Sequence, residues 1–300
     1  MNRLLVLFTI FFILPFVSII AQDDLMDLLG DQTKTTDYTY ATFKTTRIIN
    51  AQSVENPAQG VLMFLIQHRF GRINSGGYEF FGLDQATIRL GLEYGITQRL
   101  SIGVGRSSYE KTYDGFLKYK ILRQSAGLMN MPISLSYYLS TAIRTLKWED
   151  ENRTNYFSSK VSYTHQLLIA RKFNKAISIQ IIPSLIHKNL VPTGEDKNDI
   201  FSVGIGGRIK LTQRMSVNAE YFYTPTNQIS YDFNQPFSLG LDIETGGHVF
   251  QLHFSNAQAF FERGYITETN GKWSNGDIYF GFGISRVFTI IKPQTIKTTE

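Results

Sequence analysis

The sequence predicts an all-β protein, a transmembrane antiparallel up-and-down β-barrel of about 12 strands with an N-terminal signal peptide. Three observations predict it. The N-terminus is charged, then apolar, and ends at a small residue. Apolar and polar side chains alternate from about residue 58 onward. The connections alternate between tight turns and longer polar loops. We therefore expect the protein in a bacterial outer membrane, where a closed sheet pairs every main-chain amide internally.

The composition favours many strands and excludes several kinds of site. The 300 residues include 23 Phe, 16 Tyr and 24 Gly but only 8 Pro, and charged residues make up 18%. The chain has no Cys, which excludes disulfides, thiolate metal sites, a cysteine nucleophile and a lipid anchor on cysteine. The net charge of +5 is spread along the sequence, so we expect no nucleic-acid partner. No motif with metal-ligand spacing appears, and we predict no metal and no cofactor.

The first 21 residues have the pattern of a cleaved secretory signal. Arg3 supplies a positive charge, residues 4–20 are almost wholly apolar, and Ala21 is a small residue at the boundary. The alternative is a transmembrane helix. The acidic residues that follow, and the lack of a basic cytoplasmic flank, favour cleavage after Ala21. Residues 22–37 are predicted to form an acidic periplasmic extension outside the barrel.

Residues 38–288 are predicted to form the barrel, because a strand places alternate side chains on opposite faces. In residues 86–96 one face is apolar and the other is polar or small. The apolar face holds Ile88, Leu90, Leu92, Tyr94 and Ile96. Similar alternation recurs near residues 100–105, 201–210, 215–223 and 237–244. A soluble β-sandwich also alternates, but it would not need such uniform strand lengths.

The connections fall into two groups. Tight turns are predicted at residues 96–99, 171–175, 211–214 and 244–247. Longer polar loops are predicted at residues 71–85, 145–157, 189–198, 225–235 and 256–276. In outer-membrane barrels the short turns face the periplasm. The loop 256–276 carries Phe260, Phe261, Tyr265 and Trp273, and its length indicates a lid or a recognition surface.

Aromatic residues near the strand ends are predicted to form girdles at the membrane surfaces. These residues are Tyr94, Tyr119, Tyr221, Tyr223, Phe237, Phe254 and Phe288. The strand ending at Phe288 looks like the aromatic-ended terminal strand that barrel-assembly machinery recognises, although residues 289–300 follow it as a tail. We therefore expect outer-membrane lipid and that machinery as partners.

One part of the barrel is expected to hold chain inside it. Residues 60–70 are apolar on both faces, with Met63 and Leu65 on one and Phe64 and Ile66 on the other. A strand that is apolar on both faces needs cover on both. The hypothesis is that residues 38–50 pack inside the lumen against this strand.

A family resemblance rests on three stretches of sequence. They are Gly60-Val-Leu-Met-Phe-Leu-Ile-Gln-His-Arg-Phe-Gly71, Phe81-Gly-Leu-Asp-Gln-Ala-Thr-Ile-Arg-Leu-Gly-Leu-Glu-Tyr-Gly95 and Leu100-Ser-Ile-Gly-Val-Gly-Arg106. Together with Asn50-Ala-Gln-Ser-Val-Glu55 they resemble a Bacteroidetes-type β-barrel family, domain of unknown function 5777. The resemblance covers residues 38–288. It implies an outer-membrane barrel and supplies no reaction, ligand or catalytic residue.

The inward face is predicted to carry charges of both signs. The predicted lumen-lining residues are Arg89, Glu93, Lys118, Lys120, Arg208, Lys210, Glu220, Asp242 and His253. Such groups either line a water path or neutralise one another, and pairing is the favoured interpretation. Bulky inward residues such as Phe116 and Phe222 indicate a narrow or closed lumen.

Three functions remain open. The first is passage of a small solute through a narrow or gated lumen. The second is a non-enzymatic scaffold that docks a periplasmic partner through the acidic extension. The third is a lipid-modifying enzyme with a Ser-His pair on the lipid-facing surface, for which His165 is the candidate. No serine lies in a nucleophile motif, so we predict no catalytic residue. His68 and His253 are interpreted as hydrogen-bonding residues of the lumen.

Overall fold

The computed structural model describes residues 35–148, 150–191, 193–194, 196–228 and 233–292. The predicted signal peptide, most of the predicted extension 22–37 and the end of the tail lie outside these residues. Cleavage after Ala21 therefore stays a prediction.

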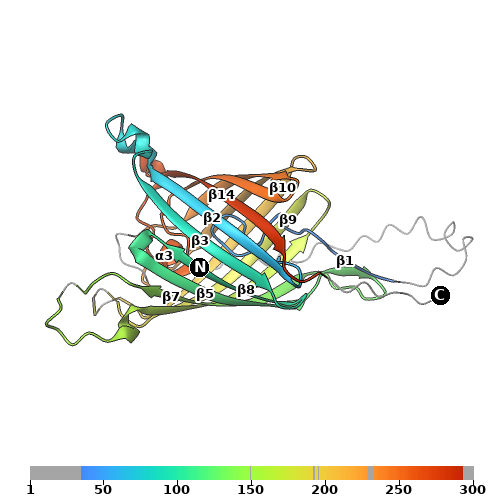
Figure 1. The fold of residues 1–300 in the computed structure, drawn as a ribbon, viewed down its shortest axis with the longest axis horizontal. Coiled ribbons are helices and arrows are strands. Elements are labelled where there is room, and N and C mark those ends of the chain that lie inside the picture. Colours follow the sequence, from blue (N-terminus) through green and yellow to red (C-terminus); the bar gives the residue numbers. More distant parts are fainter. Residues whose placement is uncertain (1–34, 149, 192, 195, 229–232, 293–300) are drawn as a thin grey trace, which may run out of the picture.

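The described chain forms a closed antiparallel barrel of 12 strands (Figure 1). Its strands are β2 (Val61–Arg72), β3 (Ala86–Gly95), β4 (Leu100–Ser107), β5 (Thr112–Leu122), β7 (Ser134–Arg144), β8 (Val161–Lys172), β9 (Ile177–Lys188), β10 (Asp199–Lys210), β11 (Met215–Tyr223), β12 (Phe237–Thr245), β13 (His248–Ser255) and β14 (Tyr279–Thr289). Each strand pairs with its sequence neighbours, and β14 closes the ring on β2, with Thr289 opposite Val61. The predicted fold class and strand number are confirmed.

The alternation of side chains sorts the two faces of the wall. In β3 the apolar residues Ile88, Leu90 and Leu92 are exposed on the outside, whereas Arg89 and Glu93 are buried inside. The same alternation runs through β10 and β11. The outside is therefore a continuous apolar surface for lipid, and the inside carries the polar groups.

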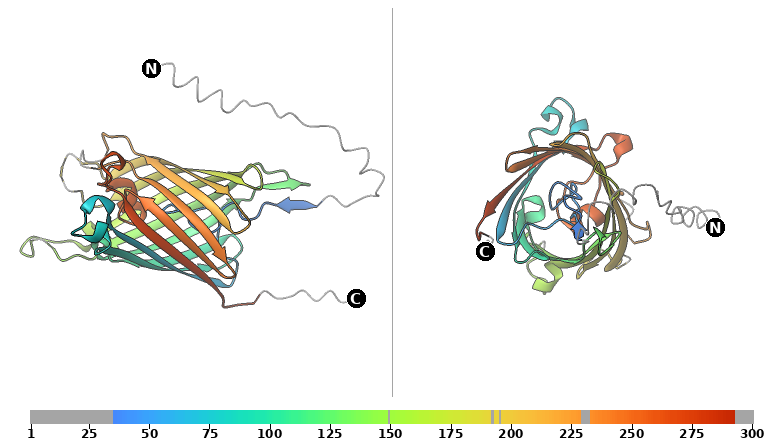
Figure 2. Two further views of the ribbon diagram at one scale, coloured as in Figure 1. Left: turned by 90° about the horizontal axis from the view of Figure 1, so that it is seen from above. Right: turned by 90° about the vertical axis from the view of Figure 1, so that its right-hand side faces the viewer.

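The tight turns lie together at one end of the barrel, which we call the periplasmic end. They join β3 to β4, β8 to β9, β10 to β11 and β12 to β13. The connection of β5 to β7 at this end is longer, and it contains β6 (Ser125–Gly127). This strand pairs with β1 (Thr36–Tyr38) in a small sheet, which we call the rim sheet. The rim sheet projects beyond the barrel (Figure 2, left).

The other end carries the longer loops and short helices. The helices are η2 (Ile73–Ser75), η3 (Phe80–Gly82), η4 (Tyr109–Lys111), η5 (Phe157–Lys160), α3 (Glu262–Thr267) and η6 (Trp273–Asn275). Within the described ranges, no helix is both long enough and apolar enough to cross a membrane.

Two pieces of chain occupy the inside of the barrel. Residues 42–57, which we call the lumen segment, and residues 256–272, which we call the inner loop, are largely buried. The view along the barrel axis shows the lumen segment, in blue, inside the ring of strands (Figure 2, right). The apolar core contains residues of both pieces and of the wall, among them Phe43, Ile48, Phe222 and Tyr265. The core of this protein is therefore the filled lumen.

The ladder between β8 and β9 is interrupted near its middle. Paired residues run from Ser162 and Lys188 to Gln166 and Ser184, and they resume at Ile169 and Ile181. Pro183 lies in the gap, and proline has no N–H to donate to a ladder. On its other side Pro183 is within an unbroken ladder with β10.

Candidate functional site

All nine predicted lumen-lining residues lie at inward-facing positions of the wall. Seven of them are almost fully buried, and Lys120 and Lys210 are half-buried near the periplasmic end. The buried residues are Arg89, Glu93, Lys118, Arg208, Glu220, Asp242 and His253. Charges that are buried this deeply need hydrogen-bond or ion-pair partners. Several of these partners belong to the chain inside the lumen.

The seven predicted girdle residues lie on the outer face and form two levels. Tyr94, Tyr119 and Phe288 lie near the periplasmic ends of their strands. Those near the opposite ends are Tyr221, Tyr223, Phe237 and Phe254. Aromatic rings at two levels fit the two surfaces of a membrane.

The lumen segment contains a tight hairpin. Arg47 and Gln52 form a bridge, the N–H of Ser53 donates to the carbonyl of Thr46 at 2.8 Å, and the N–H of Ile48 donates to the carbonyl of Ala51 at 2.8 Å. The apex of this hairpin, residues 48–51, lies inside the barrel. Most of its main-chain N–H and carbonyl groups have no partner within the hairpin and must form hydrogen bonds with the wall.

Glu220 of β11 binds the apex. Its carboxylate accepts hydrogen bonds from three successive main-chain N–H groups, those of Ile49 at 3.1 Å, Asn50 at 2.8 Å and Ala51 at 3.1 Å. The side chain of Asn50 also donates to the hydroxyl of Ser238 at 3.0 Å. These N–H bonds offset part of the free-energy cost of burying the Glu220 carboxylate.

Lys118 of β5 binds the returning arm of the hairpin. Its ammonium donates to the carbonyls of Ser53 at 3.1 Å and Glu55 at 2.6 Å, and to the side-chain oxygen of Gln52 at 3.1 Å. Gln180 of β9 lies beside it. It accepts from the N–H of Val54 at 2.9 Å and donates to the carbonyl of Gln52 at 2.7 Å.

The sequence analysis favoured ion pairs among the charged residues of the wall, but few such pairs form among the described residues. Arg89 and Asp114 form one fully buried ion pair across β3 and β5. Glu93 lies 3.7 Å from Arg47 of the lumen segment. Asp242 accepts instead from the amides of Asn218 at 2.6 Å and Gln251 at 2.7 Å. Glu93, Lys118 and Glu220 therefore face the segment and not each other, which sequence spacing cannot reveal.

The inner loop is not the external lid or recognition surface that its length suggested. It folds into the barrel, where Arg69 of β2 holds it by donating to the carbonyls of Ala257 at 2.5 Å and Ala259 at 3.2 Å. Arg69 also donates to the side chain of Asn50 at 2.8 Å and lies over the ring of Phe260. One buried guanidinium thus joins the inner loop to the lumen segment. Nothing in the local sequence distinguished Arg69 from the other inward cations.

A network of charges closes the inner loop at the loop-bearing end. Glu268 accepts from Lys188 at 3.0 Å and lies 3.5 Å from Arg263, which also pairs with Glu110 of η4. Burial alone would raise the pKa of Glu268, but Arg263 and Lys188 outweigh it and hold that pKa below its ordinary value.

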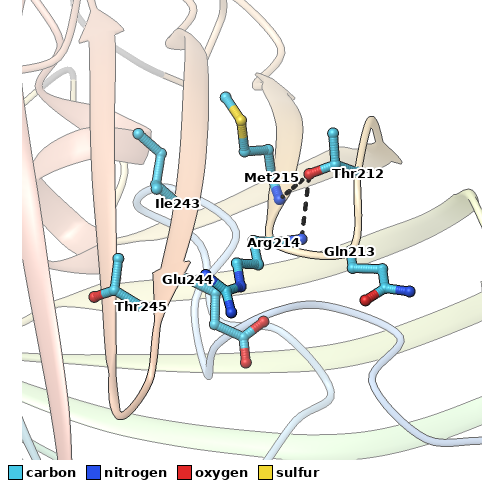
Figure 3. A pocket seen from close by; sticks show the side chains of 7 residues that line it. All are labelled: Thr212, Gln213, Arg214, Met215, Ile243, Glu244 and Thr245. Carbon is cyan, nitrogen blue, oxygen red and sulfur yellow. Dashed lines mark hydrogen bonds between the residues drawn. The ribbon is translucent and has the colours of Figure 1, made fainter.

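A recess of about 570 Å³ lies at the periplasmic end between the turns 211–214 and 244–247 (Figure 3). Lys44 of the lumen segment reaches this place, where it donates to the carbonyl of Gln213 at 2.8 Å and pairs with Glu244. Because Glu244 is half-exposed, this contact is open to water and holds the segment weakly.

The wall around the lumen segment carries a belt of serines near the periplasmic end. Ser101, Ser136, Ser178 and Ser216 lie on β4, β7, β9 and β11 and are completely buried. None of their hydroxyls has a hydrogen-bond partner among the described residues. Small polar side chains at this level would be hydrated readily if the segment were absent.

Inward-facing cations gather on one part of the wall near this end. The cations Lys118, Lys120, Arg208 and Lys210 lie on β5 and β10, within the six-strand arc from β4 to β10. The other arc carries Glu93, Glu220 and Asp242 on β3, β11 and β12, together with the cations Arg69 and Arg89 on β2 and β3.

The three histidines that the sequence analysis named lie on different strands, His68 on β2, His165 on β8 and His253 on β13. On the outer face, Nδ1 of His165 is hydrogen-bonded to the Tyr137 hydroxyl at 2.6 Å. His68, which the sequence analysis assigned to the lumen, faces outward because its parity is that of Phe64 and Ile66, and it stacks on Phe282. His253 is buried inside beside Phe260, and neither of its ring nitrogens has a bond to a described residue. In the part of the chain that the structure describes, no group of His, Asp and Glu could hold a metal ion.

The family assignment agrees with this architecture. The membrane bound beta barrel domain (DUF5777) matches residues 43–288, which is most of the chain. The chain belongs to this family. Its DUF5777 barrel begins, by that match, inside the lumen segment and ends at the girdle residue Phe288. The barrel is thus membrane-bound and of the outer-membrane type.

Several solved structures are similar to this DUF5777 barrel at low sequence identity. NanC porin is 7% identical over 76% of this chain and 98% of the porin, with a TM-score of 0.46. An outer-membrane channel of Pseudomonas putida F1 is 12% identical over 78% and 97% of the two chains, with a TM-score of 0.44. Outer membrane phospholipase A of Escherichia coli is 11% identical over 75% and 89%, with a TM-score of 0.42. No curated protein matches the sequence.

Proposed function

We propose that this DUF5777 barrel is a gated outer-membrane channel for a small polar solute, and that it acts without catalysis. The observation that carries the proposal is the polar wall behind the lumen segment. A wall that served only to pack a permanent core would gain stability from apolar side chains. This wall instead keeps a belt of serines without partners among the described residues, and buried charges of both signs.

The described conformation is closed, and opening requires the lumen segment to move toward the periplasm. The segment is held mostly by polar contacts, each of which contributes a net ~0.5–1.5 kcal/mol because water replaces it on release. The apolar side chains of Phe43, Ile48 and Val54 hold it further, since all three are buried. Many such contacts must be lost together, so we expect openings to be rare without a trigger.

A disulfide lock tests the proposal directly, because the natural chain has no Cys. The variant Asn50→Cys/Ser238→Cys joins the apex to β12 at a place where the two side chains are in contact. In planar bilayers, the oxidised variant should lose the conductance events of the wild type, and reduction should restore them. Serine in place of both cysteines serves as the matched control. If oxidised and reduced protein conduct alike, the lumen segment is not the gate.

The rim sheet favours a second candidate function, docking of a periplasmic protein. Leu128 and Met129 beside β6 are 68% and 61% exposed, and Tyr40 beyond β1 is 71% exposed. Exposed apolar side chains that gather at one place commonly mark an interaction site. Leu128→Ser/Met129→Ser should abolish co-purification of such a partner and leave the conductance unchanged, whereas equal recovery with wild type would refute docking there.

The hydrolase alternative has its own test. If the barrel acted on lipid through His165, phospholipase activity of the purified protein would disappear in His165→Ala. We expect no activity above background in either protein.

A further inference from the structure

The wall holds the lumen segment chiefly by its main chain. The inference drawn from these contacts rests on the proposed channel function. It names the class of solute that the channel would pass. The contacts come from β5, β9, β11 and β13, which surround the segment.

One side of the wall accepts main-chain N–H groups. The Glu220 carboxylate takes those of residues 49–51, and the side-chain oxygen of Gln180 takes that of Val54. Neither interaction depends on which side chains the segment carries there. The same carboxylate could accept the terminal ammonium group of a peptide, which offers several N–H donors at one point.

Three wall residues, on β5, β9 and β13, donate to main-chain carbonyl groups. Lys118 binds the carbonyls of Ser53 and Glu55, Gln180 that of Gln52, and Gln251 that of Ile48 at 2.7 Å. Lys118 lies on β5 and Glu220 on β11, five strands apart around the ring. The two charges therefore have the polarity that a peptide zwitterion would meet, with its carboxylate toward Lys118 and its ammonium toward Glu220.

Glycines in the wall leave room for the side chains at the apex. A Cβ at Gly206 would come within 2.4 Å of the Ile48 side chain, and one at Gly240 within 3.1 Å of Ile49. The wall thus combines main-chain recognition with small apolar hollows, the arrangement that binds a peptide with little regard to its sequence.

We propose that the solute of this channel is a short peptide, which takes over these wall contacts when the lumen segment withdraws. Glu220 binds its N–H or ammonium groups, Lys118 its carbonyl or carboxylate groups, and Gln180 one peptide unit between them. A channel that selected only by size would treat a sugar of equal mass in the same way.

Swelling of proteoliposomes in triglycine and in glucose, which are similar in mass, tests this proposal. The ratio of the two rates is the readout, because it does not depend on how often the channel opens. The wild type should admit triglycine faster by about tenfold, the factor that one hydrogen bond to a charged group supplies. Gln180→Ala should bring the ratio toward one. Gln166→Ala should leave the ratio unchanged, since Gln166 bonds Ser184 of the wall and not the segment.

If the wild type stays shut in liposomes, a variant in which a short glycine-serine linker replaces residues 44–55 keeps the wall intact and removes the hairpin from the lumen. The peptide assignment would be overturned, while the channel stands, if the triglycine-to-glucose ratio is near one in the wild type or in this open variant. It would also be overturned if Gln180→Ala has the same ratio as the wild type. Failure of both solutes to pass through the open variant would instead overturn the channel itself.

Discussion

The Glu220 carboxylate accepts the main-chain N–H of Asn50 at 2.8 Å inside the barrel, 170 residues away along the chain. The two neighbouring N–H groups bind the same carboxylate, so one wall residue fixes the whole apex of the lumen segment. Both Glu220 and Asn50 are buried from solvent. The hold on the segment is thus concentrated at a few wall residues, and each can be tested singly.

Glu220→Gln should make openings more frequent. Glutamine keeps the size of the side chain but loses the charge and one acceptor oxygen, so the apex loses about 1–2 kcal/mol of binding. The expected result in single-channel recordings is a rise of about tenfold in opening frequency. Glu244→Gln at the half-exposed rim is the control and should change the frequency far less. An opening frequency equal to that of wild type would show that Glu220 does not hold the gate.

Lys118→Met should destabilise the folded protein. Methionine retains the apolar stem but leaves the carbonyls of Ser53 and Glu55 without their donor in a buried place, at a cost of about 2 kcal/mol or more. Urea unfolding in detergent micelles measures the free energy of unfolding. Lys210→Met, which changes a half-buried cation near the rim, is the matched control. Equal losses in the two variants would contradict a special role for Lys118.

Glu268 should make the anchoring of the inner loop depend on pH. Its pKa is lowered in the folded protein, so its stabilisation is complete above the unfolded value of about 4.3 and is lost as pH falls through the folded pKa. Thermal unfolding of wild type and Glu268→Gln should therefore differ most above about pH 5 and converge once the pH has fallen below the lowered pKa of Glu268. A difference that is constant across this range would rule out the ion pairs as its source.

Pro183→Val should tighten the seam between β8 and β9. Valine restores an N–H in the gap of that ladder, between the pairs at Gln166 and Ile169. Hydrogen exchange of the amides at Leu168 and Ile169 should slow by about fivefold or more, which corresponds to roughly 1 kcal/mol for one ladder bond. The ladder between β9 and β10 is already continuous and supplies the internal control. Unchanged exchange on the β8 side would show that proline is not what interrupts the pairing.

The barrel could be predicted from sequence because its pattern is local. Apolar residues such as Ile88 and Leu90 alternate with polar ones, and a period of two fixes which face each residue takes. The same parity places Gln180 on the inner face, although the sequence analysis did not single it out. It also places His68 outside, so that assignment to the lumen was avoidable.

The contents of the lumen could not be predicted in the same way. The contacts of Arg69 with Ala257 and Ala259 span 188 and 190 residues, and no periodicity encodes contacts over that distance. The inner loop has apolar Phe260 and Phe261 among polar residues, a composition that serves equally in a lid and in a plug. The strands of the rim sheet have three residues each, too short for alternation to be seen.

The lumen segment enters and leaves the barrel through the same mouth. Lys172 at the end of β8 contacts Tyr40 before the segment, and after it Gly60 donates to Gly95 at the periplasmic end of β3. The hairpin can therefore be drawn out as a closed loop, with no chain end threaded through the pore. Both ends of the lumen segment remain attached to the periplasmic end of the barrel. The withdrawn segment therefore stays at high local concentration beside its binding site in the wall. Such a plug reseals by a unimolecular step, at a rate that is independent of how much protein the membrane contains.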